Sequence, residues 1–71
     1  MQVVATFYVG FGTGRWKCVG PYFGRGRDAL DASDNAMSRC AIEFAGEDVL
    51  FMTFASLAHV EEETPAGVPS E

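Results

Sequence analysis

The residues best suited to binding chemistry are cations interleaved with aromatic rings in the first third of the chain. Cationic side chains attract phosphates and aromatic rings stack on bases, so this combination on a flexible hairpin is what single-stranded nucleic-acid binding requires. The alternative is that the rings belong to the core or to a dimer interface and that the cations keep the hairpin in solution. A net charge of −5 argues against a nucleic-acid binder. The set comprises Arg15, Trp16, Lys17, Tyr22, Phe23, Arg25 and Arg27.

Carboxylates are confined to the rest of the chain. Residues 1–27 carry four cations and no acid (+4), whereas residues 28–71 carry all ten acids and one cation, Arg39 (−9). Such a sign difference indicates a charged partner, and carboxylates such as Glu61–Glu63 complement a basic protein surface that otherwise holds nucleic acid. The alternative is a solvated helix face and a charged tail. We predict partner contacts at Arg15, Trp16, Lys17, Tyr22, Arg25, Arg27, Glu61, Glu62 and Glu63.

No motif in the sequence predicts catalysis. The segment GFGTGRWK lacks the GxxxxGK[ST] spacing of a phosphate-binding loop, and Cys18 stands where a magnesium-binding hydroxyl is needed. His59, the single histidine, has no identifiable nucleophilic partner. One histidine and two cysteines are too few for a tetrahedral zinc site. We therefore expect neither an enzyme nor a cofactor or metal.

The elements that position these residues begin with a hairpin. In Gln2–Phe11 the apolar side chains alternate with period two, which predicts a strand. Gly12–Gly14 predicts the turn, and Arg15–Phe23 the returning strand. Pro21 has no amide proton, so this second strand is expected to be an edge strand or to bulge there. Six of the eight glycines lie between residues 10 and 26, which indicates close backbone approach or mobility.

A loop, a helix and a strand are expected to follow the hairpin. We predict a turn or exposed loop at Gly24–Arg27, and a short extended stretch at Asp28–Ala32 at most. Ser33 resembles a helix N-cap and Gly46 the residue that ends the helix. The apolar helix face comprises Ala36, Met37, Cys40, Ala41 and Phe44. Val49–Val60 has apolar residues at both odd and even positions, which predicts one long central strand. A helix from Ser56 to residue 62 is the alternative.

These elements predict an α+β fold: a small single domain in the order ββαβ, with a three-stranded, largely antiparallel sheet and one helix packed on one face. Residues 1–63 form the domain, and we expect residues 64–71 to be a disordered tail. The uncovered sheet face would hold Val4, Tyr8 and Trp16, and an apolar patch of this kind predicts a dimer or a protein partner.

The cysteines and the hydropathy indicate the compartment. Cys18 in a strand and Cys40 on the helix face are expected to be unpaired thiols in a reducing cytosol rather than a disulfide. No signal segment follows Met1, and no apolar run approaches the roughly 18 residues of a membrane span. The sequence therefore predicts a soluble cytoplasmic protein that does not contact membranes.

The chain resembles the small α+β proteins of phages and mobile elements, and among those it is similar to compact anti-CRISPR inhibitors. The resemblance covers about residues 2–63: an aliphatic first strand (VVATFYV), a short helix (SDNAMSRCAIEFAG), a hydrophobic closing strand (VLFMTFASLAHV) and an acidic end. It implies a non-enzymatic inhibitor that binds a Cas surveillance complex in the host bacterial cell and blocks its access to nucleic acid. It implies no particular site residue, and the cationic hairpin departs from simple DNA mimicry. The alternatives are a small nucleic-acid-binding module that uses the hairpin and a homodimeric structural domain.

Overall fold

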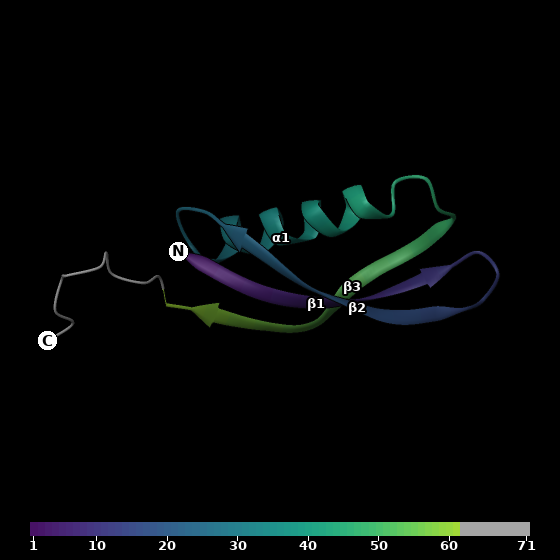
Figure 1. Ribbon diagram of the computed structural model, residues 1–71, viewed down its shortest axis with the longest axis horizontal. Helices are drawn as coiled ribbons and strands as arrows, with labels where there is room; N and C mark the ends of the chain where they lie inside the picture. Colours follow the sequence, from purple (N-terminus) through teal and green to yellow (C-terminus); the bar gives the residue numbers. More distant parts are fainter. Residues whose placement is uncertain (62–71) are drawn as a thin grey trace, which may run out of the picture.

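The computed structural model describes residues 1–61 and confirms the ββαβ fold (Figure 1). The strands are β1 (Gln2–Phe11), β2 (Trp16–Arg25) and β3 (Val49–Val60), and the helix is α1 (Ala29–Glu43). All strand pairs are antiparallel, in the order β2-β1-β3, so β1 is the central strand. The predicted tail, together with Glu62 and Glu63, lies outside the described residues.

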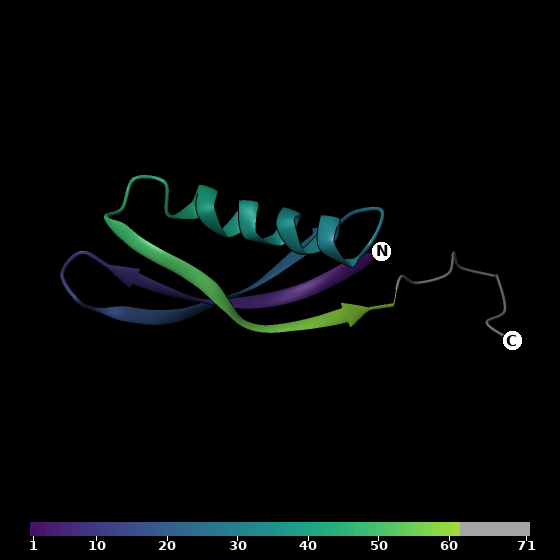
Figure 2. The same ribbon diagram turned by 180° about the vertical axis from the view of Figure 1, so that it is seen from behind.

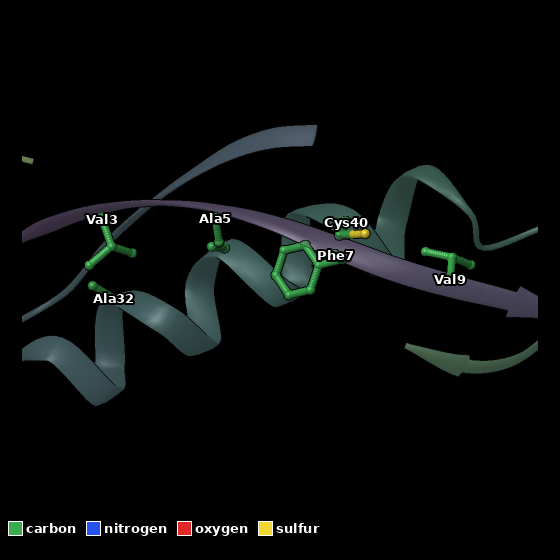
Figure 3. Close-up of a cluster of buried hydrophobic side chains, with 7 residues drawn as sticks. Val3, Ala5, Phe7, Val9, Ala32 and Cys40 are labelled. Carbon is green, nitrogen blue, oxygen red and sulfur yellow. The ribbon is translucent and has the colours of Figure 1, made fainter. Parts of the chain in front are cut away.

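The core lies between β1 and α1. Alternate side chains of β1 are buried and face the helix, as the period-two pattern predicts, and Figure 3 shows them lined up along the strand above α1. The helix contributes small residues, which allow it to approach the sheet closely. The buried apolar set comprises Val3, Ala5, Phe7, Val9, Ala32, Ala36 and Cys40.

The helix rests directly on Gly24 of β2 and on Gly26 just after it, and this contact explains why the loop predicted at Gly24–Arg27 begins only at Gly26. A Cβ atom at Gly24 would lie 2.1 Å from the carbonyl oxygen of Ala32, and one at Gly26 would lie 2.5 Å from the amide nitrogen of the same residue. Here glycine serves close backbone approach rather than a turn, so β2 continues to Arg25 beneath the helix.

The helix begins earlier than the sequence predicts. Asp28 is the N-cap, and its Oδ1 accepts a hydrogen bond from the amide of Asp31 at 2.9 Å. Aspartate caps a helix as well as serine does, and this one comes first in the chain. Ser33, the predicted cap, is buried within the helix, where its hydroxyl donates to the carbonyl oxygen of Ala29 at 2.7 Å. The predicted extended stretch at 28–32 is therefore the first helical turn.

Two further predictions about α1 are wrong in detail. The helix ends at Glu43 with Phe44 as C-cap, and the amide of Phe44 donates to the carbonyl oxygen of Cys40 at 3.3 Å. Gly46 does not adopt a positive φ and lies beyond this cap, so it is not the residue that ends the helix. Ala41, which was placed on the apolar face, is exposed.

The closing strand is confirmed as a single strand through Val60, which excludes the helical alternative for residues 56–60, whereas residue 62 lies outside the described part. Its predicted central position is wrong, because β3 pairs only with β1 and forms an edge. Its side chains are apolar on both faces although α1 packs mainly on β1 and β2. In Figure 2, β3 runs diagonally across the front of the sheet.

The other edge is interrupted at Pro21, as expected. The Gly20–Pro21 peptide bond is cis, Gly20 has a φ of +130°, and the pairing of β1 with β2 shifts register between Ala5 and Phe7. A proline in a central strand would have removed a ladder hydrogen bond on one side. At an edge the bulge is accommodated, and directly after it Tyr22 faces the helix side and Phe23 the open face of the sheet.

Candidate functional site

Aromatic side chains gather on the face of the sheet that α1 leaves uncovered. Tyr8, Trp16 and Phe51, one from each strand, lie on this face and are called the aromatic cluster below. Trp16 is 65% exposed, Phe51 50% and Tyr8 40%. Aromatic rings are normally among the more buried residues of a domain, so three of them this exposed are unusual. The uncovered face expected from the sequence is thus present.

The cluster has a defined geometry. The rings of Tyr8 and Trp16 meet edge to face, with centroids 5.5 Å apart and an interplanar angle of 80°, an arrangement that aromatic pairs prefer. The ring of Phe51 lies over Gly10, where a Cβ atom would be only 1.9 Å from it. The three rings line an open recess of about 260 Å³. Gly10 therefore allows the ring of Phe51 to lie flat against the sheet.

Further along the same face the surface becomes polar. The hydroxyls of Thr6 and Ser56 share a hydrogen bond of 2.6 Å across β1 and β3. Beyond them Phe23, opposite Val4, forms a second and separate apolar spot that is half exposed. The aromatic cluster is thus confined to the hairpin end of the sheet, and the opposite end carries one phenylalanine.

The structure does not bring the predicted basic and aromatic residues together. Lys17 lies on the helix side, where its ammonium stands 5.5 Å from the ring centroid of Phe44. Tyr22 also faces the helix, and its hydroxyl donates to Oε1 of Glu43. Arg27 lies beyond β2, with its Nε 3.9 Å from Oδ2 of Asp31. A continuous track of cations beside rings, as a nucleic-acid groove needs, is not formed by these residues.

The remaining predicted residues lie at opposite ends of the sheet. Arg25 ends β2 opposite Gln2, whereas Arg15 precedes Trp16 in the hairpin turn. Glu61 follows Val60, which also pairs with Gln2, so it lies at the end of the sheet far from Arg15. Of the predicted set, Trp16 belongs to the aromatic cluster and Arg15 directly precedes it in the chain. Phe51 was not predicted, although the apolar run on both parities of β3 was the signal for it.

A second recess, of about 520 Å³, adjoins the cluster at the hairpin turn. Arg15 and Lys17 line one part of it, and Glu47 and Asp48 line the other. The amide of Gly12 donates to the carbonyl oxygen of Asp48 at 2.9 Å, which holds the loop before β3 against the turn. Trp16 also lines this recess, so three predicted residues meet there, and because cations and carboxylates face the same space it favours neither sign of ligand.

Charge is sorted between the two layers of the fold. None of the residues of β1, β2 and β3 is an aspartate or glutamate, whereas Lys17 and Arg25 lie in β2. In the described chain the carboxylates occur on α1, at its cap, in the loop after it and at Glu61. The aromatic cluster therefore lies on a carboxylate-free sheet, and the negative charge lies mainly behind it.

Two titratable groups on the helix side have shifted pKa values. Burial, reinforced by the hydrogen bond to Glu43, raises the pKa of Tyr22 above its ordinary range. Burial also raises the pKa of the Cys40 thiol. Both groups stay protonated at neutral pH, so neither is an activated nucleophile. Cys18 is exposed on the open face, and Cys40 is buried between α1 and the sheet. The two thiols therefore lie on opposite sides of the sheet and form no disulfide.

Among residues 1–61, no three histidine, cysteine or carboxylate side chains are grouped so that they could hold a metal ion. Within the same residues, α1 is neither long nor apolar enough to cross a membrane. Comparison with protein-family models, with curated proteins and with solved structures found no match.

Proposed function

We propose that this chain is a non-enzymatic binding protein that contacts a protein partner through the aromatic cluster. The observation that carries the proposal is the exposure of Trp16, Tyr8 and Phe51 on one face of three strands that carry no carboxylate. Tryptophan and tyrosine dominate the energetics of protein interfaces because they bury a large area at little entropic cost. A contiguous apolar recess lined by three rings is a suitable anchor point for such an interface.

The proposed partner is a nucleic-acid-handling complex, and the specific form is a phage anti-CRISPR-type inhibitor that blocks nucleic-acid access to a Cas surveillance complex. Acidic residues on the helix layer support this form, because they complement basic surfaces that hold nucleic acid. The aromatic cluster would anchor the inhibitor, while the carboxylates of the helix layer would attract the basic residues of the partner. Unpaired Cys18 and Cys40 are consistent with action in the reducing cytoplasm of a host cell.

A second candidate function, direct binding of single-stranded nucleic acid, rests on the absence of carboxylates from the three strands. Rings that project from a sheet can stack on bases, and Arg15 adjoins Trp16. The dispersal of Lys17, Arg25 and Arg27 disfavours this candidate. Fluorescence anisotropy with a labelled oligonucleotide decides it: binding that weakens steeply with salt supports the candidate, and no binding at low salt excludes it.

The main proposal is tested with purified Cas surveillance complexes and matched variants. Trp16→Ala should weaken binding by roughly 30-fold or more, the effect typical of an interface hot spot. Ile42→Ala, at a side chain of α1 that is 75% exposed, should bind like the wild type. Equal affinity of the wild type and Trp16→Ala for a bound complex would contradict the role of the cluster, and no binding to any complex would contradict the anti-CRISPR form.

A further inference from the structure

The two edges of the sheet differ in how well they are protected. The β2 edge carries Pro21 and the cations Lys17 and Arg25, which discourage pairing with another strand, whereas register shifts occur in the pairing of both edges. The β3 edge is 12 residues long and contains no proline, lysine, arginine, aspartate or glutamate. Long apolar edge strands of this kind are ready to pair with a further strand.

The helix leaves β3 uncovered on its own side of the sheet. Phe54 pairs with Phe7 and Leu57 with Ala5, so both face the helix side. They are nevertheless 36% and 49% exposed. Equally, the bulged residue Leu50 is 71% exposed at the edge. Among residues 1–61, therefore, no layer covers these side chains of β3.

One side of α1 is directed away from β2 and toward this uncovered region. Asn35 accepts a hydrogen bond from the amide of Arg25, and Glu43 accepts one from Tyr22, so these two side chains point to β2. Met37 lies two positions after Asn35, and Ala41 lies two positions before Glu43. Because consecutive residues of a helix are about 100° apart, both project from the opposite side. This opposite side is mainly apolar, with the exposed Ala41 on it and the carboxylate of Asp34, seven residues before Ala41, at its first turns.

The charge of the uncovered region fits association with an identical surface. A chain of net charge −5 repels its own copies except where the contact excludes like charges. The strand β3 is such a place, since the only titratable side chain within it is His59. Antiparallel pairing around a two-fold axis is self-complementary, because each strand offers the other the same row of amides and carbonyls.

The exposed apolar area of β3 supplies part of what a stable dimer needs. At about 200 Å² for a large side chain, the exposed parts of Leu50, Phe54 and Leu57 amount to roughly 300 Å² on β3 alone. The strand edge and the facing side of α1 add to this. A standard interface buries about 800 Å² on each partner.

We propose that two copies of this chain associate through β3, with the strands antiparallel, to form a continuous six-stranded sheet with both helices on one face. Phe54 and Leu57 of each copy then pack against their counterparts beneath the two helices. The aromatic clusters of both copies lie on the opposite face, toward opposite ends of the sheet. This dimer goes beyond the proposed function and does not depend on it, because its interface excludes the aromatic cluster.

Sedimentation of the wild type and two variants tests the dimer. The wild type should sediment at twice the chain mass of 7.7 kDa at high micromolar concentration. Leu57→Lys should raise the dimer dissociation constant on the order of 100-fold, because each copy would bury an unpaired charge. Ile42→Lys is the matched control, since Ile42 lies seven residues after Asn35 on the β2 side of α1, and it should remain dimeric.

A wild-type monomer at millimolar concentration would overturn the proposal, and so would a Leu57→Lys variant that stays dimeric. Amide hydrogen exchange of the wild type tests the same pairing and does not require any variant to fold. It should show protection at successive residues of β3, including those whose amides point away from β1. Rapid exchange at these alternate amides would refute β3 pairing. Trp16→Ala should leave the dimer intact, which separates this test from that of the proposed function.

Discussion

The contact between α1 and Gly24 predicts that Gly24→Ala is far more destabilising than an ordinary glycine substitution. The added Cβ would lie 2.1 Å from the carbonyl oxygen of Ala32, where ordinary contact begins at 3.4 Å, so the helix must retreat by about 1.3 Å. It would also lie 2.6 Å from the amide nitrogen of Ala36. Both obstacles are backbone atoms, so no side-chain rotation relieves the clash.

The expected loss of stability follows from the gap that this movement of α1 opens between the helix and the sheet. Overpacking of a core costs about 1–3 kcal/mol, and a gap of 0.5–1 Å already forfeits roughly a quarter to a half of each dispersion contact it separates. Because Ala32 and Ala36 both pack on β1, we expect a cost near the upper limit, about 3 kcal/mol. For a domain of this size that lowers the Tm by about 12–24 °C.

Thermal unfolding followed by circular dichroism measures this effect against two controls. Gly46 has open space around it and no positive φ, so Gly46→Ala should raise the stability by about 0.4–1 kcal/mol through the unfolded state. Gly14 also has open space but a φ of +90°, so Gly14→Ala should cost about 1–2 kcal/mol from backbone strain alone. If Gly24→Ala melts within about 4 °C of the wild type, α1 does not lie at this distance from β2.

The other predictions concern the helix cap, pH and thiols. Asp28→Ala should destabilise the protein by about 1 kcal/mol by removing the N-cap, whereas Ser33→Ala should change the stability by less than about 0.5 kcal/mol; equal losses in urea unfolding would restore Ser33 as the cap. The raised pKa of Tyr22 means that, above the ordinary tyrosine pKa of about 10, the unfolded chain loses this proton before the folded one does. The stability is thus fully present below pH 10 and should fall as the pH rises further, and Tyr22→Phe should flatten that fall; an unchanged slope in urea unfolding at alkaline pH would contradict this. A thiol reagent should modify Cys18 rapidly and Cys40 only after unfolding, so rapid reaction of two thiols per native chain would contradict the burial of Cys40.

The secondary structure could be predicted wherever a single periodicity dominated. In β1 one parity is buried and the other is not, so the pattern of Val3 to Val9 reports the strand and its inner face directly. At the start of α1 two residues could cap the helix, and local sequence does not rank Asp28 above Ser33. The choice depends on whether Gly24 and Gly26 let the first turn rest on β2, which is a tertiary contact.

The site was harder to predict because linear neighbours diverge in a strand. Trp16 and Lys17 are adjacent in sequence but point to opposite faces, so a cluster of cations and rings along the chain is divided by the pleat. Phe51 joins Trp16 only through the register of two strand pairs. The apolar run of β3 suggested burial in the middle of the sheet, whereas its side chains are apolar at an edge.

The separation of charge between the layers gives the molecule an electric moment directed across its thickness. Within residues 1–61 six carboxylates lie on and around α1, one lies at Glu61 and none lies on a strand, so the negative end of this moment lies on the helix side. Near a charged surface this moment orients the molecule before contact, within the screening distance of about 8 Å at physiological salt. A cationic surface attracts the helix layer and an anionic surface repels it, so the rings bind the proposed partner only where its basic residues lie on the α1 side of the contact.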